Sequence, residues 1–470
     1  MPSATSMFAD SKPFTVAVVG GGIGGLALAV GLLKHRVNFH IYEGALAFSE
    51  IGAGVGFGPN ARQAMSLIDP RIKQGYDRHA TVSFHEDAKD HFFQFRMGMD
   101  GKDGTEGLRA GDIISKPGGS GKGMNMIHRA RFLDELVSLI PDECASFGKR
   151  LVSVQAIYDG VRLYFGDGTT AEASALVGCD GVKSKVRRSL FKETSNARFT
   201  GKYAYRGLVP MAKAVDLLGE RRARNAQGYL GYGGHVLTMP VERGAIMNVV
   251  AFRTKPGGKW EDTEWVLPMR RDDMNRDFAD WSDDVKKILD LMEKPDIWAL
   301  FDHPPIPQLW QGRICLLGDA AHASTPHQGS GAGMALEDAY ILSELIGHVH
   351  SADELEGAFE AYSRVRHPRD MKLVETSRAC GEVYEFLGPD TGDDVRKIDQ
   401  DLKTRYDWIW DVDLTDQFTH AMDILQTRRK EKPKSMDTMS TPAYLYVGGE
   451  RAGACRILGD ASGKFILAPT

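Results

Sequence analysis

Twice along the chain, a short apolar run ends in a cluster of glycines and then continues as an apolar segment with helical spacing. The two passages, residues 16–35 and 314–346, lie far apart in the sequence. Each predicts a buried strand that turns directly into a helix, so that free backbone N–H groups gather where a phosphate or another oxyanion binds. A single nucleotide needs one such site, and two sites therefore favour a long, extended cofactor.

The first passage has the spacing of a dinucleotide-binding turn. Residues 16–42 predict a strand, a helix and a second strand, and a parallel strand pair with a helical crossover indicates a doubly wound sheet. The glycines of the G-x-G-x-x-G pattern are Gly20, Gly22 and Gly25. They allow the tight turn, the approach of a pyrophosphate and close helix packing, and Glu43 at the end of the second strand would accept hydrogen bonds from a ribose. The alternative is an ordinary strand-to-helix turn.

The second passage combines a carboxylate with another helix start. Asp319 follows the strand over 314–317 and would accept hydrogen bonds from a polyol chain; the alternative is a helix N-cap. Gly329 and Gly331 precede the helix expected over 332–346, and they leave N–H groups that point at a growing anion. We expect this passage to hold the far end of the same cofactor.

A metal site is not expected here, although the residue types invite one. Asp319, His322 and His327 offer the two histidines and one carboxylate of a common metal triad. Pro326 interrupts any helix between the two histidines, and their spacing puts them on different faces.

The chain divides into regions that differ in their pattern of predicted strands and helices. Residues 1–190 and 301–375 carry the parallel-sheet pattern, and we expect them to form one discontinuous nucleotide-binding domain of the doubly wound, Rossmann-like α/β class. Residues 191–300 hold strand candidates separated by turns, which predict an inserted antiparallel sheet for the substrate. Residues 376–430 are expected to be helical, and 431–470 to form a loosely ordered tail. The strand candidates of the inserted sheet are 203–209, 235–239 and 246–252.

A glycine-rich stretch, 97–124, interrupts the first region and predicts a long surface loop suited to act as a lid. A helix over 131–137 and strands over 151–157, 161–165 and 175–179 are expected to follow it.

Composition narrows the class of protein. A hydrophobic fraction of 42% and a charged fraction of 26% are ordinary for a soluble globular protein, and a net charge of -5 argues against nucleic acid as a partner. The five cysteines are scattered without a C-x-x-C pair, which argues against zinc and disulfides and favours the cytoplasm. Residues 16–33 are apolar, but their glycines favour a strand-to-helix unit over a membrane span, and the polar N-terminus lacks a signal-peptide pattern.

Three longer signatures stand in order along the chain. The first is the glycine pattern with Glu43, the second is Cys179-Asp180-Gly181 with the basic residues to Arg187, and the third is Gly318-Asp319-Ala320-Ala321-His322 with Pro326, Gly329, Gly331, Glu337 and Asp338. Gly54 and His128-Arg129 add further matches. With these motifs, over residues 14 to about 420, the sequence resembles the single-component FAD-dependent aromatic hydroxylases (class A flavoprotein monooxygenases), especially the fungal salicylate hydroxylase-like members.

The resemblance implies a role for each cofactor-binding residue. Glu43 would hold the adenosine ribose, and Arg129 would reach the flavin or its pyrophosphate. Asp180 would order the site that FAD shares with the incoming nicotinamide. Asp319 would bind the ribityl chain, and the backbone at 329–333 would lie by the flavin pyrimidine edge. The full expected set is Gly20, Gly22, Gly25, Glu43, Gly54, Arg129, Asp180, Asp319, Gly329, Gly331 and Ala332.

The resemblance also implies the reaction. FAD, held without a covalent bond, would take hydride from NADH or NADPH and react with O2, and a C4a-hydroperoxyflavin would hydroxylate an aromatic substrate of the phenolic or salicylate type. We nominate Arg206 for the substrate's anion, because arginine stays charged and offers a fork of donors; an arginine on the solvent face of a strand is the alternative. His235 is a candidate acid, base or substrate contact, or else a structural histidine. Pro326, beside the second glycine turn, completes the catalytic set.

One departure from the family's sequence pattern narrows the range of expected substrates. In some fungal relatives that dearomatise phenolic aldehydes, a tyrosine precedes Pro-Val and partners the arginine, whereas this chain has Met239. A thioether cannot donate the hydrogen bond of a phenol.

A non-oxygenating flavin reductase and a non-catalytic nucleotide binder of the same fold remain alternatives. The preference between NADH and NADPH, the regiochemistry and a homodimer all stay open.

Overall fold

The computed structural model describes residues 11–48, 54–81, 92–118, 123–192, 195–255 and 257–431, together with four short strands between 446 and 469. The chain forms two compact units, Met1–Leu425 and Gln426–Thr470. The described parts of the second unit are the last residues of α16 (Leu414–Glu431) and two hairpins. Their strands are β20 Tyr446–Val447, β21 Glu450–Arg451, β22 Cys455–Gly459 and β23 Phe465–Pro469.

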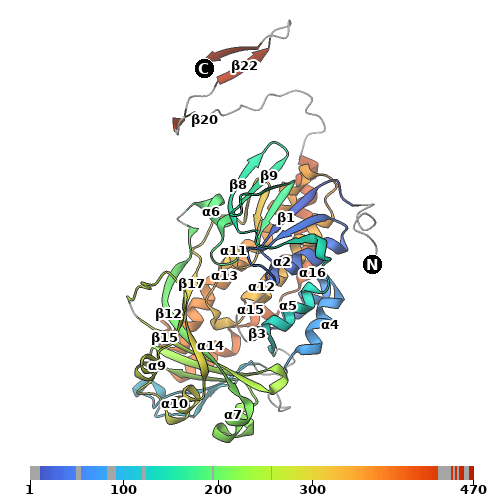
Figure 1. Cartoon of the computed structure of the whole chain (residues 1–470). Coiled ribbons are helices and arrows are strands. Elements are labelled where there is room, and N and C mark those ends of the chain that lie inside the picture. The colour runs from blue at the N-terminus through green and yellow to red at the C-terminus, as the bar shows by residue number, and fades with distance from the viewer. Residues whose placement is uncertain are drawn as a thin grey trace. The chain divides into compact units, whose positions relative to one another are not determined.

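A six-stranded sheet in the order β18-β19-β11-β1-β2-β7 organises the first unit (Figure 1). Its strands are β1 Thr15–Val19, β2 Asn38–Tyr42, β7 Ala145–Ser146, β11 Ala175–Gly178, β18 Trp310–Gln311 and β19 Ile314–Leu316. Strands β19, β11, β1, β2 and β7 run parallel, and only β18 is antiparallel to its neighbour. The carboxyl ends of the parallel strands therefore meet at one edge of the sheet, where ligands bind in folds of this kind.

Two apolar helices pack closely together beside this sheet. They are α2 Ile23–Lys34 and α12 Gly331–Gly347, and most of the residues of each are buried. A Cβ on Gly24 would lie 2.8 Å from Leu317 and 3.3 Å from the Cβ of Ala335, and one on Gly31 would clash with Ser343. Small residues thus let α2 approach α12 and the end of β19 closely.

A second, eight-stranded sheet has the order β16-β17-β12-β15-β14-β13-β4-β5 and is antiparallel except where β13 pairs with β4. Its strands are β4 Gln94–Met97, β5 Ile113–Ser115, β12 Arg198–Pro210, β13 Gln227–Gly231, β14 Gly234–Val241, β15 Ile246–Thr254, β16 Val266–Pro268 and β17 Glu293–Asp302. Within the described part of the stretch 97–124, residues 98–112 form the expected irregular segment with one short 3-10 helix, but β5 interrupts the predicted loop. Phe95 and Met97 of β4 are buried against this sheet, and β5 extends its edge.

Helices cover both faces of the eight-stranded sheet. Helices α7 (Met211–Leu218), α9 (Arg271–Asp277) and α10 (Asp283–Asp290) pack on one face, the side away from the six-stranded sheet (Figure 1). The other face packs against α13 (Leu355–Tyr384), α14 (Val395–Thr404) and Met334 of α12. This second face, which we call the inner face, lies next to the helix that starts at the second glycine turn.

The remaining elements belong to the first unit, except that α16 continues past Leu425. Strands β8 Leu151–Ile157, β9 Gly160–Phe165 and β10 Thr170–Ala173 form a three-stranded sheet, and β3 Gly54–Phe57 pairs with β6 Asn125–His128. The other helices are α3 Pro59–Ile68, α4 Pro70–His79, α5 Arg129–Val137, α6 Lys185–Phe191, α7 Met211–Leu218, α8 Glu220–Ala223, α9 Arg271–Asp277, α10 Asp283–Asp290, α11 Asp319–His322, α13 Leu355–Tyr384, α14 Val395–Thr404, α15 Asp407–Trp410 and α16 Leu414–Glu431. Among the described residues, no helix has both the length and the apolar character that a membrane crossing requires.

Candidate functional site

The first glycine turn leaves no room for side chains at two of its positions. Gly20 adopts a φ of +107°, and a Cβ there would clash with the carbonyl oxygen of Cys179. A Cβ on Gly25 would clash with the carbonyl oxygen of Gly20. Gly22 is the N-cap of α2, and no side chain of the described residues caps this helix. The first N–H groups of α2 are thus left to bind an oxyanion.

Glu43 lies beside this turn, directly after β2. One carboxylate oxygen accepts a hydrogen bond from the Gly21 N–H at 2.7 Å, and the other accepts from the Ala45 N–H at 2.7 Å. These bonds fix the orientation of the half-buried carboxylate. Each oxygen keeps a further lone pair with which it can accept hydrogen bonds from ribose hydroxyls.

The second turn presents Asp319 at the start of α11. Asp319 is exposed although the other three residues of this short helix are buried. One of its carboxylate oxygens would lie 3.9 Å from a Cβ on Gly331, so the carboxylate lies close to the N-terminus of α12. Gly329, with a φ of +61°, ends the short 3-10 helix Pro326–Gln328 that leads into α12, and Pro326 itself is exposed. Ala332, half-buried, follows in the first turn of α12.

Strand β11 lies between the two turns and joins them into one surface. Cys179 and Asp180 follow this strand and contact Gly20. The carboxylate of Asp180 accepts hydrogen bonds from the Ser184 hydroxyl at 2.5 Å and from the Lys185 N–H at 2.7 Å, so it caps α6. Burial raises the pKa of Asp180, and these hydrogen bonds oppose that shift. Asp180 therefore holds its own turn in place at the edge of the sheet.

Gly54 and Arg129 lie where the two sheets meet. Gly54 pairs with His128 in the β3–β6 ribbon, and a Cβ on Gly54 would lie 3.0 Å from Val241 of the eight-stranded sheet. Arg129 follows His128 and begins α5. Its positive charge reaches across to the inner face, where it adds to the effect of burial on Arg206.

Arg206 occupies the inner face of the eight-stranded sheet. On β12 it lies between Val250 of β15 and Asp296 of β17, and its guanidinium carbon is 4.6 Å from the ring centroid of Trp298. Burial, together with the charge of Arg129, lowers the pKa of Arg206 to about 10, so the side chain remains protonated at neutral pH. Arg206 is half-buried and does not face solvent. Its charged, planar guanidinium is suited to bind a planar oxyanion.

Met239 shares this inner face with Arg206. It pairs with Asn248 on β15, one pleat along from the Leu237–Val250 pair that lies beside Arg206, and it is buried. The position expected for a tyrosine partner is thus close to the arginine in this fold, but it is filled by an apolar side chain.

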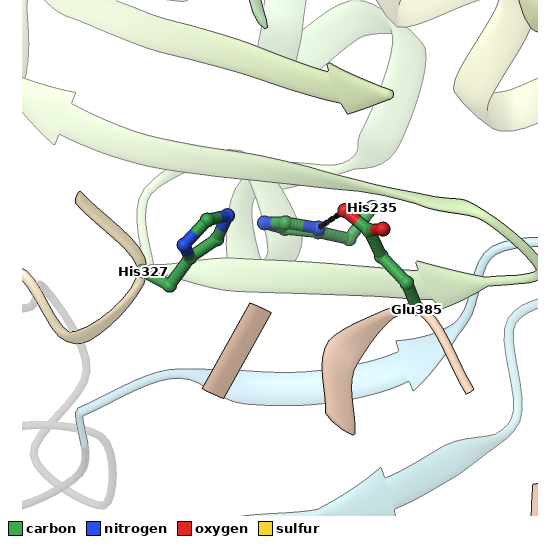
Figure 2. Close-up of side chains that lie close together, drawn as sticks. All are labelled: His235, His327 and Glu385. Atoms are coloured by element: carbon green, nitrogen blue, oxygen red, sulfur yellow. Dashed lines mark ion pairs between the residues drawn. The ribbon is translucent and has the colours of Figure 1, made fainter. Parts of the chain in front are cut away.

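His235 is fully buried on β14 and lies in a cluster that includes two residues from outside the sheet (Figure 2). Its ring stacks on Phe252 with 4.3 Å between centroids, and its Nδ1 lies 3.3 Å from a carboxylate oxygen of Glu385. The ring of His327 lies 5.2 Å away, centroid to centroid. Glu385 follows α13 and also bonds Lys202 of β12.

Sequence reasoning missed Glu385 and Lys202. Glu385 lies in the region that was expected only to be helical, and no motif marks it. Lys202 lies just before the strand expected over 203–209, and no motif marks it either. His327 was considered only as a metal ligand, and the structure brings it to His235 rather than to His322.

An ionic cluster beneath the second turn supports its shape. Asp338 accepts hydrogen bonds from the Gly318 N–H at 3.2 Å and from His322 at 2.8 Å, and Arg366 binds its other oxygen at 2.8 Å. Burial opposes protonation of His322, but the carboxylates of Asp370 and Asp338 outweigh it and raise the pKa of His322 to about 9. The positive charges of the His322 imidazolium and of Arg366 together compensate the negative charge of the buried carboxylates.

Comparison with known proteins places this geometry in a family. The family described as FAD binding domain matches residues 143–377. The 6-methylsalicylate 1-monooxygenase atA of Aspergillus terreus is 39% identical over 437 residues, which cover 91% of this chain and 96% of that protein. A salicylate hydroxylase of Pseudomonas putida is 38% identical over 427 residues, which cover 86% of this chain and 94% of that protein. The solved structure of a salicylate hydroxylase substrate complex superposes with a TM-score of 0.78 at 36% identity, and the match covers 87% of this chain and 98% of that chain.

The chain therefore belongs to the FAD-binding flavoprotein monooxygenases. It is an FAD-dependent enzyme of the salicylate hydroxylase-like group, as its sequence motifs predicted. The predicted fold class, a Rossmann-like α/β domain with an inserted antiparallel sheet and C-terminal helices, is confirmed. The roles of individual site residues and the domain boundaries stay predictions.

Proposed function

We propose that this enzyme hydroxylates a small aromatic acid or phenol of the salicylate type, with NADH or NADPH as the reductant and O2 as the oxidant. The observation that carries the proposal is the presence of Arg206, a half-buried cation, and His235, a buried imidazole, on the inner face of the sheet that packs against α12. Relatives named for 6-methylsalicylate and salicylate support the same substrate class. A cytoplasmic location and a homodimer remain predictions.

The residues at the edge of the six-stranded sheet fit FAD. The N–H groups at the start of α2 would hold the pyrophosphate, Glu43 the adenosine ribose and Asp319 the ribityl chain. The start of α12 at Gly331 would stabilise negative charge at the flavin pyrimidine edge. When bound and reduced, FAD supplies the activation of O2, which no side chain of the protein can provide.

The protein's own residues position the substrate and exclude water. Arg206 would bind the carboxylate or phenolate of the substrate, with Trp298 restricting the guanidinium from one side. Leu237, Met239 and Val250 give the inner face an apolar surface for the ring and keep water from it. Because Met239 offers no donor, we expect ring hydroxylation, with or without loss of the carboxylate, rather than a reaction that needs a tyrosine at this position.

A substrate screen tests the proposal. Purified protein is incubated with FAD, NADH or NADPH, and a panel of phenols and hydroxybenzoates, and both NAD(P)H consumption and product mass are measured. We expect at least one salicylate-type acid to stimulate NAD(P)H oxidation and to gain one oxygen atom or exchange its carboxylate for a hydroxyl. NAD(P)H oxidation that yields only hydrogen peroxide with every compound would instead support the non-oxygenating reductase.

Replacing Arg206 by methionine tests its role directly. A charge-assisted hydrogen bond contributes about 1.5–3 kcal/mol, so KM for a carboxylate-bearing substrate should rise by about 10–100-fold. The FAD content should not change. The control is Arg253→Met, because Arg253 on the neighbouring strand also lies over an aromatic ring, Phe278, which packs on the opposite face of the sheet. Equal KM values for the two variants would remove Arg206 from the substrate site.

A further inference from the structure

One carboxylate oxygen of Glu385 accepts hydrogen bonds from two other side chains. That oxygen accepts hydrogen bonds from Lys202 Nζ at 2.5 Å and from the Thr254 hydroxyl. Glu385 and Lys202 are both buried. Burial favours the neutral acid, but His235 and Lys202 outweigh it and lower the pKa of Glu385 to about 2. The group is therefore an ionised carboxylate, although it lies inside the protein.

The second carboxylate oxygen of Glu385 faces His235 Nδ1 at 3.3 Å. Within the described residues the geometry of this contact falls short of a hydrogen bond, but an ionised carboxylate can only accept, so it favours the proton on the nitrogen that faces it, Nδ1. Burial lowers the pKa of His235, partly against the effect of Glu385, so the ring is neutral and its Nε2 is left as an acceptor. Figure 2 shows this second nitrogen turned towards His327, on the side away from Glu385.

The nitrogen atoms on that side have no hydrogen-bond partner within the described residues. This holds for His235 Nε2 and for both ring nitrogens of His327, and all of these atoms are buried. Buried polar atoms in folded proteins are nearly always paired, so these unpaired nitrogens indicate that a further polar group belongs there. The ring of His327 fits because a side chain at Gly381 would collide with it.

A divalent metal is the obvious competing occupant, since two imidazoles and a carboxylate within 4.8 Å of one another are suitable ligand types. However, the ammonium of Lys202 already neutralises Glu385, and a dication would have to bind beside that cation. A neutral, hydrogen-bonding group of the substrate meets no such repulsion.

We propose that Glu385, held by Lys202, is a positioning residue that keeps the proton of His235 on Nδ1, so that Nε2 accepts the proton of a phenolic substrate. In this step the substrate O–H bond breaks, an Nε2–H bond forms, and the electron pair stays on the oxygen as phenolate. The resulting imidazolium is stabilised by the adjacent carboxylate. The phenolate is the electron-rich form of the ring that hydroxylation needs. This inference rests on the proposed function, because it requires a phenolic substrate.

The variant Glu385→Gln keeps the size of the side chain and removes its charge. We expect FAD content and substrate-free NAD(P)H oxidation to stay unchanged, and the fraction of NAD(P)H that yields hydroxylated product to fall at least tenfold. The acid limb of the pH–rate profile should move to lower pH, because the imidazolium loses its carboxylate neighbour. The titratable or charged groups facing His235 are Glu385, Lys202, His327 and Tyr384.

An acidic phenol separates positioning from mere structural damage. A fluorinated substrate that is already ionised at the assay pH needs no base, so it should restore coupling in Glu385→Gln to near the wild-type value. The matched control is Glu344→Gln, because Glu344 also bonds a lysine and a histidine, Lys34 at 2.7 Å and His35 at 3.0 Å, at the other end of α12. That variant should couple normally with both substrates.

Several results would overturn the inference. They are normal coupling of Glu385→Gln with the ordinary phenol, no rescue by the acidic one, or stoichiometric metal in the wild-type protein that Glu385→Gln loses. If Glu385→Gln does not fold, nitrogen-15 NMR of the wild-type histidines still tests the inference. We expect the Nδ1–H tautomer at His235, and the Nε2–H tautomer would contradict the inference. Failure of the wild-type enzyme to hydroxylate any phenol is a different outcome, which refutes the proposed function itself.

Discussion

Replacing Arg366 by methionine is expected to lower the free energy of unfolding by about 3–5 kcal/mol, the usual cost of removing one partner from a buried ion pair. Arg366 is fully buried on α13 and bonds Glu337 at 2.7 Å, Asp338 at 2.8 Å and Asp370 at 3.3 Å. Methionine fills similar space but leaves these carboxylates without their shared cation. Urea unfolding of the FAD-free protein, followed by tryptophan fluorescence, measures the change.

The control for this prediction lies on the same helix. Arg364 is exposed, and its one ion pair among the described residues is with Glu360, one turn away, so Arg364→Met should change the free energy of unfolding by about 0.5 kcal/mol or less. Because Asp338 also accepts the Gly318 N–H, Arg366→Met should weaken FAD binding as well. Similar unfolding curves for the two variants would show that the buried cluster contributes little.

The variant Gly22→Glu is expected to bind FAD at least about a thousandfold more weakly, which corresponds to about 4 kcal/mol. A carboxylate at the N-cap of α2 would lie where the pyrophosphate belongs, and like charges in contact cost several kcal/mol. The φ of -76° at Gly22 is allowed for any residue, so the fold should survive. Titration of the FAD-free protein, with quenching of FAD fluorescence as the signal, measures the affinity.

Gly22→Ala separates charge from bulk. It adds a methyl group at the same backbone position without a charge, so FAD affinity should fall because the methyl group crowds the pyrophosphate, but by less than in Gly22→Glu. An equal loss in both variants would mean that steric exclusion, rather than the charge of the pyrophosphate, determines the specificity of this turn. Retention of full affinity in Gly22→Glu would place the pyrophosphate elsewhere.

The elements that local physics determines could be predicted from the sequence. An apolar strand followed by G-x-G-x-x-G and an apolar helical pattern strongly favours a strand-turn-helix unit. Helices α2 and α12 lie within two residues of their expected bounds. Parallel strands also bring their carboxyl ends together. The sequence alone therefore sufficed to expect Gly20, Asp180 and Asp319 at one edge, and the structure brings their turns together there.

Features that depend on long-range packing could not be predicted in this way. Glu385 reaches His235 only because the end of α13 packs on the inner face of the eight-stranded sheet, and no local pattern encodes that contact. The stretch 97–124 has a loop-like composition, yet β5 finds a strand partner in β4 and extends the sheet. Pairing with the preceding strand, itself held by β13, outweighed the local preference for a loop at these three residues.

Amide hydrogen exchange with and without ligands tests the central claim most directly. If FAD lies along the sheet edge from the first glycine turn to the second, FAD should slow exchange both in residues 20–26 and in residues 318–334, while ADP should slow it only in 20–26. FAD that protects one segment and leaves the other unchanged would contradict a single cofactor held by both turns.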